Sequence, residues 1–333
     1  MHRVAIVGAG ISGLTCGVAF AEGGHGTTIF AREIGPQTTS AVAAALWFPY
    51  DVEPADKAIP WALETYQTLI ELARNSNSGV SIIELRQFSR TKEIETPDWA
   101  IPLGARRLSD IATALCRRAD GSRGKRLDTA RPQGFRSGFS LRVPLMDTTI
   151  YLDYLANRFL KADGQITGNV CFEKLEDVDP KCDLVINCAG IGARELVHDT
   201  DLEPHRGQVA IVPRIKDLPY AVVCDDPPLM YAIPRTNDCV FGGTNDLSDD
   251  LAVDSATTAR IVAECSRTLE IEKPNVLTER VGLRPFRKSG VRIERARLHD
   301  GRTVVHNYGH GGAGFTLSWG CAAEVLQRGT ASG

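Results

Sequence analysis

The sequence predicts an α/β fold of two domains, and three observations lead to this prediction. The chain has 333 residues, 43% of them hydrophobic and 24% charged, so it can bury a large core, and at roughly 100 to 200 residues per domain its length suggests two domains. Near the N-terminus, an apolar run rich in β-branched residues leads through closely spaced glycines into a helical pattern. Near the C-terminus, a second strand pattern leads through glycine-rich residues 309–314 into another helix.

The N-terminal motif reads VAIVGAGISG over residues 4–13 and predicts a buried parallel strand that turns directly into a helix over residues 11–22. In its G-x-G-x-x-G spacing, Gly8 permits a tight turn, Gly10 lets the backbone approach a pyrophosphate, and Gly13 allows the helix to pack on the strand. The helix N-terminus adds amide donors and a partial positive charge. This spacing is typical of a Rossmann-like domain that binds FAD or NAD, and it does not separate the two.

The end of the next expected strand, residues 27–30, carries two charged side chains, Arg32 and Glu33. Glu33 follows Gly13 by 20 positions, the place at which an acidic group holds ribose hydroxyls in this motif. A solvated loop residue is the alternative for Glu33. Arg32 either contacts the adenosine ribose or faces water.

Composition and charge exclude several classes of function. With 38 basic and 41 acidic residues the formal charge is −3, so no overall positive field favours nucleic acid or anionic lipid. The nine cysteines contain no C-x-x-C pair, and no histidine cluster has zinc spacing; we therefore expect no metal site and a reduced, cytoplasmic compartment. No signal peptide, long apolar span or peroxisomal S-K-L ending is evident, which predicts a protein that is neither targeted nor bound to a membrane.

A hydroxyl cluster, a run of small residues and then aromatic residues make up PQTTSAVAAALWFPY over residues 36–50. Four further blocks follow in order: DLVINCAG at 183–190, RGQ at 206–208, VGLRP at 281–285 and HNYGHGG at 306–312. On these five segments, which together span nearly the whole chain, the sequence resembles the D-amino acid oxidase family. Members of this family are flavoenzymes that carry a Thr-Thr stretch before A-A-x-L-W-x-P-Y.

Two of these blocks have a physical interpretation of their own. Residues 184–186 form an apolar strand pattern that ends at Asn187-Cys188-Ala189-Gly190, which is either a backbone contact to a cofactor or an ordinary strand end. Residues 303–308 predict a strand, 309–314 a glycine loop and 316–328 a helix whose N-terminus points at something anionic. In the family that the chain resembles, this is the flavin ring, whose reduced form is an anion.

Because both glycine-rich ends contribute to one cofactor site, the domains are expected to be discontinuous. The predicted fold is a Rossmann-like FAD-binding domain with an interleaved, mostly antiparallel α+β domain that binds substrate and forms the interface. We assign residues 1–48, 145–206 and 284–328 to the FAD-binding domain, and 49–144 and 207–283 to the second domain. Strands of the second domain are expected over residues 208–212, 229–234 and 238–242.

The resemblance implies FAD-dependent oxidative deamination of D-amino acids. Hydride passes from the α-carbon to flavin N5, water hydrolyses the imino acid to a 2-oxo acid and ammonia, and O2 reoxidises the flavin to give hydrogen peroxide. This chemistry requires no general base, so we predict no catalytic acid or base residue and expect orientation and electrostatics to carry catalysis. Homodimers are common among relatives, and a homodimer is expected here.

Four residues are expected to bind substrate. Arg284 matches the family's carboxylate-binding arginine; its guanidinium fork suits two carboxylate oxygens, and the following Pro285 favours an extended backbone. A structural ion pair is the alternative for Arg284. Tyr231 matches a tyrosine whose hydroxyl meets the same carboxylate, with a core tyrosine as the alternative. Gly312 would offer its carbonyl to the amine, and Phe48 replaces a glutamine of vertebrate relatives, which makes the pocket wall more apolar.

The expected cofactor contacts include the glycine motif, Arg32 and Glu33, residues of the blocks that carry the resemblance, the C-terminal glycine loop with the start of the helix after it, and Val170. The expected FAD-binding residues are Gly8, Ala9, Gly10, Ile11, Ser12, Gly13, Arg32, Glu33, Thr38, Thr39, Ser40, Ala44, Ala45, Leu46, Val170, Cys188, Ala189, Gly190, Arg284, His310, Gly311, Gly312, Ala313, Gly314, Phe315 and Thr316.

Departures from the family pattern bear on specificity. Many relatives place a second tyrosine on a lid loop where this chain has Pro227, so we expect weaker or differently built gating. Asn245 stands where relatives specific for acidic substrates carry arginine, which favours neutral or apolar D-amino acids, although Arg235 lies on the strand face of Tyr231 and could receive a carboxylate. The alternatives are a D-aspartate oxidase, a glycine or N-methyl amine oxidase, and a non-catalytic flavin-binding protein.

A basic stretch over residues 106–136 is expected to be a solvated loop, or else a contact for a partner or an anionic substrate.

Overall fold

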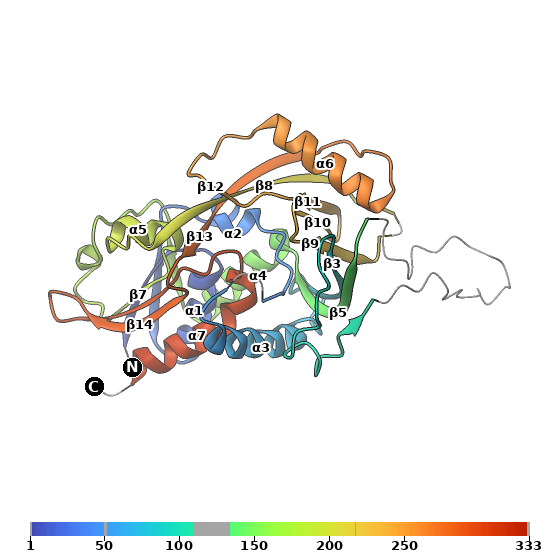
Figure 1. Ribbon diagram of the computed structural model, residues 1–333. Coiled ribbons are helices and arrows are strands. Elements are labelled where there is room, and N and C mark those ends of the chain that lie inside the picture. The colour runs from blue at the N-terminus through green and yellow to red at the C-terminus, as the bar shows by residue number, and fades with distance from the viewer. Residues whose placement is uncertain (1, 50–51, 109–133, 217, 332–333) are drawn as a thin grey trace.

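The computed structural model describes residues 2–49, 52–108, 134–216 and 218–331, and two β-sheets organise them (Figure 1). Most of the basic stretch, residues 109–133, lies outside the described residues, so its predicted role stays a prediction. No helix within the described ranges is both long and apolar enough to cross a membrane.

The first sheet has six strands in the order β14-β15-β7-β1-β2-β6, and every neighbouring pair is parallel except β14 with β15. Its central strands are buried on both faces, which explains their continuous apolar sequence. The strands are β1 (Arg3–Val7), β2 (Gly26–Phe30), β6 (Gln165–Thr167), β7 (Leu184–Asn187), β14 (Arg292–Arg297) and β15 (Thr303–Tyr308).

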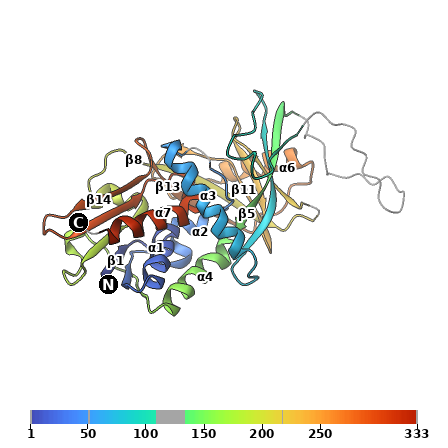
Figure 2. The same ribbon diagram turned by 90° about the horizontal axis from the view of Figure 1, so that it is seen from below.

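Helices α1 (Ile11–Glu22), α4 (Thr148–Lys161) and α7 (Gly314–Thr330) cover one face of this sheet, and α3 (Ala55–Leu72) packs on α7 (Figure 2). Helix α3 packs on α7 so closely that a Cβ added at Gly320 would overlap the backbone of Trp61. The other face packs against a smaller cluster that includes Leu175 and Leu196, from η2 (Leu175–Asp177) and α5 (Ala193–Leu196). Two further 3₁₀ turns, η1 (Gly35–Gln37) and η3 (Gly190–Gly192), and the short helix α2 (Thr39–Val42) lie in the connections.

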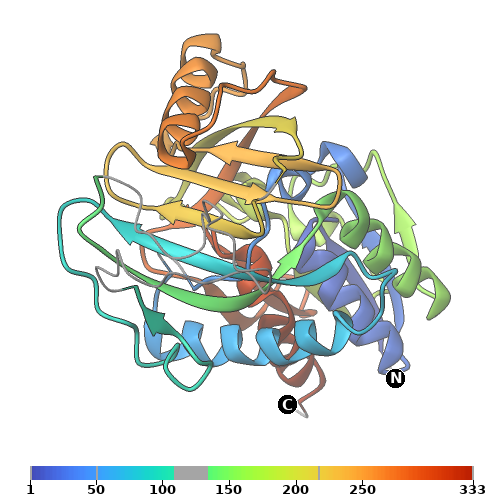
Figure 3. The same cartoon turned by 90° about the vertical axis from the view of Figure 1, so that its right-hand side faces the viewer.

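The second sheet has nine strands and is antiparallel except where β3 pairs with β9. Helix α6 (Ser255–Leu269) covers one face of it (Figure 1), and Val42, Ala44 and Leu46 pack on the other. Helix α3 runs alongside β3 and β5 (Figure 3). The strands are β3 (Val80–Ser89), β4 (Arg106–Arg107), β5 (Ser137–Met146), β8 (Leu202–Pro213), β9 (Tyr220–Cys224), β10 (Met230–Pro234), β11 (Asp238–Gly242), β12 (Asp246–Leu247) and β13 (Thr278–Arg287).

The predicted fold class is confirmed: a mostly parallel sheet with a Rossmann-like β1-α1-β2 start is joined to a mostly antiparallel sheet. All six strands of the first sheet fall inside the ranges assigned to the FAD-binding domain. Strands β5, β8 and β13 of the second sheet cross the assigned limits, each of which falls inside one of these long strands. The exact domain limits therefore stay predictions.

Candidate active site

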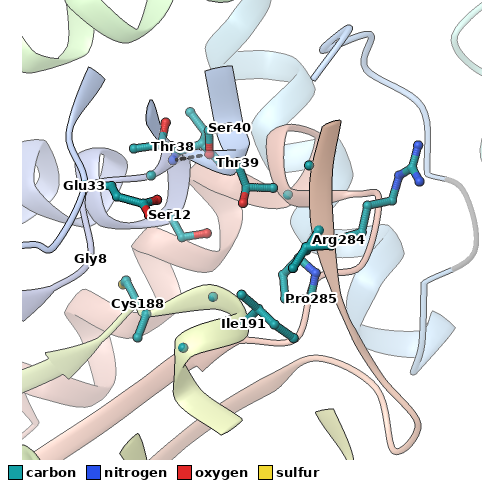
Figure 4. Close-up of a pocket in the computed structure, with 18 of the residues that line it drawn as sticks. Gly8, Ser12, Glu33, Thr38, Thr39, Ser40, Cys188, Ile191, Arg284 and Pro285 are labelled. Atoms are coloured by element: carbon teal, nitrogen blue, oxygen red, sulfur yellow. Dashed lines mark hydrogen bonds between the residues drawn. The ribbon is translucent and has the colours of Figure 1, made fainter. Parts of the chain in front are cut away.

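A cavity of about 750 Å³ lies where the two sheets meet, lined by the ends of β1, β2 and β7 and by β8, β10 and β13. In Figure 4, Ser12, Glu33 and Thr38 to Ser40 gather around the start of α1, and Arg284 and Pro285 lie at the far end. The expected site residues that line the cavity are Gly8, Ala9, Gly10, Ile11, Ser12, Arg32, Glu33, Thr38, Thr39, Ser40, Val170, Cys188, Ala189, Gly190, Tyr231, Arg284, His310, Gly311, Gly312, Gly314 and Phe315.

The turn between β1 and α1 is built from close backbone approaches. Gly8 has a φ of 111°, a conformation that favours glycine, and its N–H donates to the carbonyl of Phe30 at 2.8 Å. A Cβ at Gly8 would overlap the carbonyl oxygen of Cys188, and a Cβ at Gly13 would overlap that of Gly8. Gly13 therefore lies behind the cavity wall, where α1 packs on the turn. The start of α1 is held from the other side because the Ile11 N–H donates to Ser40 Oγ at 2.9 Å.

The end of β2 carries the two charged residues of the motif onto the cavity wall. Arg32 Nη2 donates to Cys171 Sγ at 3.1 Å, and both side chains line the cavity together with Glu33. The segment that contains Cys171 is placed there because the Val170 N–H donates to the carbonyl of Ala31 at 3.0 Å. Val170 is among the expected FAD-binding residues, whereas Cys171, for which the sequence carries no motif, is not.

The glycine loop before α7 is bonded directly to the strand that carries Arg284. Gly309 and Gly311 have φ values of 84° and 53°, so both occupy the left-handed region. The Gly311 N–H donates to the carbonyl of Pro285 at 2.9 Å, and the Ala313 N–H donates to that of His310 at 2.9 Å. The N-terminus of α7 and the Arg284 strand therefore meet at one end of the cavity.

Two histidines near this loop are held neutral by burial. His310 lines the cavity, and its Nε2 is 3.0 Å from Oδ1 of Asn307. Burial lowers the pKa of His310 to about 4. Burial, assisted by the nearby charge of Arg292, lowers the pKa of His306 to about 4 as well. Asn307, which also lines the cavity and donates to Cys16 Sγ at 3.3 Å, was not predicted as a site residue.

Arg284 and Tyr231 lie together on the cavity wall, both half-buried. Arg284 Nη1 donates to the carbonyl of Thr244 at 3.0 Å and to Oδ1 of Asn245 at 3.4 Å. Within the described part of the chain, no carboxylate pairs with Arg284. Burial raises the pKa of Tyr231, while the charge of Arg284 acts in the opposite direction. The pair thus offers an uncompensated guanidinium and a neutral hydroxyl donor, which suits a carboxylate ligand.

Part of the expected site lies behind the cavity wall. Val42 and Ala43 line the cavity, but the residues after them turn toward the protein interior: the Trp47 N–H donates to the carbonyl of Pro144 at 2.9 Å. The ring of Phe48 packs against Trp99, and its backbone bonds to the hydroxyl of the α7 residue Thr316. The expected residues outside the described lining are Gly13, Ala44, Ala45, Leu46, Phe48, Ala313 and Thr316, and their roles stay predictions.

Arg235 is not available to a substrate in this cavity. The period of two predicts that it shares a strand face with Tyr231, but Arg235 lies just beyond the end of β10 and does not belong to the described cavity lining. Its Nε and Nη2 donate to the two carboxylate oxygens of Asp238 at 2.7 and 2.8 Å, and its Nη1 donates to Thr148 Oγ1. The guanidinium is therefore neutralised within the protein.

The turn between β9 and β10, at the place of a lid loop in relatives, is fastened to the end of β3. Asp226 Oδ2 accepts from Ser89 Oγ at 2.6 Å and from the Thr91 N–H at 3.1 Å. Arg90 Nη1 donates to the carbonyl of Pro228 at 2.8 Å. No residue of this turn, which includes Pro227, belongs to the described cavity lining.

Sequence reasoning missed several lining residues. Gly207 and Gly282 stand inside the RGQ and VGLRP blocks, so the signal was present although neither residue was assigned to the site. Arg194, Glu195 and Asp249 stand in no motif. The fold brings all five to the cavity.

Comparisons with known proteins agree with this geometry. A family model described as "FAD dependent oxidoreductase" matches residues 3–328. D-amino-acid oxidases from Rubrobacter xylanophilus and Streptomyces coelicolor are each 37% identical to this chain, covering 97% and 98% of it and 94% and 96% of their own lengths. The crystal structure of glycine oxidase from Geobacillus kaustophilus superposes with a TM-score of 0.78 at 16% identity, covering 100% of this chain and 96% of that one.

Proposed function

The chain belongs to the family of FAD-dependent oxidoreductases that contains the D-amino-acid oxidases, and from this premise we propose that it is an FAD-dependent D-amino acid oxidase. The observation that carries the proposal is the pairing of Arg284 with Tyr231 at one end of a cavity whose other end has the dinucleotide motif. This arrangement places a carboxylate site next to the glycine loop of α7.

The residues present fit FAD. The cavity runs from Glu33, past the turn at Gly8 and Gly10, to the glycine loop and Arg284 (Figure 4). A Cβ at Gly10 would lie 3.0 Å from Ser40 Oγ, so glycine allows the Ser40 side chain to approach the start of α1 closely. Two helices, α1 and α7, begin at the cavity and supply amide donors with a partial positive charge. When bound, FAD supplies the acceptor for the two electrons of the oxidation.

The residues of the chain bind and orient the amino acid. The Arg284 guanidinium binds the carboxylate, and the neutral Tyr231 hydroxyl donates a second hydrogen bond to it. The carbonyl of Gly312 accepts from the amine. These three contacts fix the orientation of the amino acid and therefore the direction of its α-hydrogen. Holding the substrate in this orientation is the entropic contribution of the site to the rate. The amino acid, water and O2 together give a 2-oxo acid, ammonia and hydrogen peroxide.

Neutral or apolar side chains are the proposed preference. Val42, Val209 and Leu283 contribute apolar surface to the cavity that contains Arg284 and Tyr231. Arg235 is paired with Asp238 and is not free to bind a second carboxylate. These observations support a neutral substrate over D-aspartate, and activity across a panel of D-amino acids, glycine and N-methyl glycine tests the preference.

We also propose that the protein is a homodimer in the cytoplasm. Light scattering of the purified holoprotein tests the dimer.

The reaction is tested by mixing the holoprotein anaerobically with D- and L-forms of several amino acids while the flavin absorbance is followed. Bleaching by D-forms is expected. Bleaching by L-forms alone would overturn the stereochemical assignment, and a flavin spectrum that no amino acid bleaches would favour a non-catalytic flavin protein.

The carboxylate site is tested with Arg284→Ala. We expect kcat/KM to fall at least roughly thirtyfold, since removing one partner of a buried charge pair costs about 2 kcal/mol or more, while FAD stays bound. Arg297→Ala is the matched control, because Arg297 is exposed and lies outside the cavity lining. A normal kcat/KM in Arg284→Ala would contradict the assigned role.

A further inference from the structure

We propose that Gly207 and Gly242 are positioning residues for the substrate carboxylate, because the missing side chain at each leaves the space that Arg284 and Tyr231 occupy. The inference rests on the proposed function, which assigns the carboxylate to Arg284 and Tyr231. Position 207 on β8 and position 242 on β11 carry no side chain. They nevertheless determine where the Arg284 guanidinium and the Tyr231 hydroxyl lie.

The strand register brings each glycine under one binding residue. In the pairing of β8 with β13, Gly207 lies directly opposite Gly282. Gly282 is two positions from Arg284 on β13, so Gly207 and Arg284 lie on the same face of the sheet. In the pairing of β10 with β11, Gly242 lies directly opposite Tyr231. The surface beneath the two binding groups is thus bare backbone.

The space over Gly207 is filled by the Arg284 guanidinium. A Cβ placed at Gly207 would lie 2.6 Å from both Cζ and Nη2 of Arg284, and closer still to Nη1. These distances are far inside van der Waals contact, where C and N atoms normally stand about 3.5 Å or more apart. The guanidinium is the end of a long, flexible side chain, so it would move away while the strand stayed in place.

The space over Gly242 is filled by the aromatic ring of Tyr231. A Cβ there would overlap the ring at Cζ and the hydroxyl oxygen itself. Because the ring is rigid, the overlap cannot be relieved at one atom, and the whole side chain with its hydroxyl would have to turn away from Arg284.

Neither glycine is needed for the backbone. Gly207 and Gly242 lie inside regular strands and have φ values outside the left-handed region. Their neighbour Gly243 differs, because a Cβ there would overlap the backbone carbonyl oxygen of Leu229. Gly8 differs as well, since its φ of 111° favours glycine in any surroundings. At positions 207 and 242, the atoms nearest to an added Cβ belong to the side chains of Arg284 and Tyr231, and not to the backbone.

A second contact set shows what the space secures for Arg284. Its Nη1 donates to the carbonyl of Thr244 at 3.0 Å, and the Thr244 hydroxyl accepts from the N–H of Gln208 at 2.7 Å. The acceptor for the guanidinium is therefore fixed to the residue that follows Gly207. A methyl group at position 207 would separate the guanidinium from this acceptor and disturb the direction of its remaining N–H groups.

The test uses the holoproteins of Gly207→Ala and Gly242→Ala and benzoate, a carboxylate without an amino group, as the probe. Benzoate binding is followed through the change in flavin absorbance. We expect the Kd for benzoate and the KM for a D-amino acid to rise roughly tenfold or more, as for losing a hydrogen bond to a charged group. The Kd for FAD and the thermal midpoint should stay at the wild-type values. Gly26→Ala is the control: Gly26 lies on β2, and a Cβ there has no protein atom closer than 4.0 Å.

A double-mutant cycle separates positioning from a general structural role. If Gly207 acts only through Arg284, the double variant Gly207→Ala, Arg284→Ala should bind benzoate as weakly as Arg284→Ala alone. Additive losses would overturn the inference, and so would a Gly207→Ala protein that loses FAD or fails to fold, because the inference requires that only the guanidinium moves. Wild-type benzoate affinity in Arg284→Ala would refute the proposed function itself. A loss in Arg284→Ala with wild-type affinity in both glycine variants would refute the inference alone.

Discussion

Acidification from pH 8 to pH 5 should destabilise this protein through two buried histidines. His306 and His310 each have an ordinary pKa of 6.5 that burial lowers to about 4 in the folded chain. Between these values the unfolded chain binds a proton at each ring and the folded chain does not. Stability is therefore fully present above pH 6.5 and is lost as the pH falls toward 4.

The size of the effect follows from the two pKa values. A shift from 6.5 to about 4 corresponds to about 3 kcal/mol per histidine when complete, of which about 2 kcal/mol per histidine is lost by pH 5. The titration of Asp199 does not contribute to the loss of stability between pH 8 and pH 5. Its pKa is lowered from 3.8, against the effect of burial, by hydrogen bonds from Tyr308 and Arg287, so its contribution is lost only at lower pH.

Urea unfolding at pH 8, 6.5 and 5 measures the prediction in the wild type and in His310→Gln. The variant should lose about 2 kcal/mol less than the wild type between pH 8 and 5, because one ring no longer titrates. The comparison uses the pH dependence and not the absolute stability, so the loss of the contact to Asn307 does not affect it. His299→Gln, at an exposed position, is the control. An identical pH dependence in the wild type and His310→Gln would refute the reasoning.

Two further predictions concern the support of the cofactor site. Tyr308→Phe removes a hydroxyl that donates to Asp199 Oδ2 at 2.7 Å and should lower the free energy of unfolding by about 1–3 kcal/mol, as for a buried charged acceptor that loses a donor; unchanged stability in urea would contradict this. Gly13→Ala should weaken FAD binding by more than tenfold in a fluorescence titration, because its Cβ would overlap the backbone carbonyl of Gly8 and force α1 away from the turn; wild-type affinity would show that α1 can shift without harm.

Elements with a strong local pattern were predicted closely. The helix over residues 11–22 and the strand over residues 303–308 have the predicted limits. The helix has apolar residues at helical spacing, the strand is rich in β-branched residues, and a glycine directly follows each element. These signals act over a few residues. The short helix α2 and the 3₁₀ turns were not predicted, because so few residues carry no measurable period.

Site residues that stand in a sequence motif were easier to predict than those that stand in none. Gly8, Gly10 and Glu33 follow from the spacing of one motif, and all three line the cavity. Arg284 and Tyr231 came from the resemblance, and the strand register brings them together from segments more than 50 positions apart. The position of Phe48 could not be foreseen, because the chain turns inward at residues 44–48 to bond with β5 and α7.

The sequence by itself determined the α/β class, the dinucleotide motif and the family, because these depend on residue types at short, fixed spacings. Only the tertiary structure decided which glycines lie against the side chains of Arg284 and Tyr231. Gly207 and Gly242 look in the sequence like any strand glycine, and their role appears when a partner strand places a guanidinium and an aromatic ring above them. The physical reason is that steric exclusion acts between atoms in contact, and contacts between distant segments exist only after the sheets have formed.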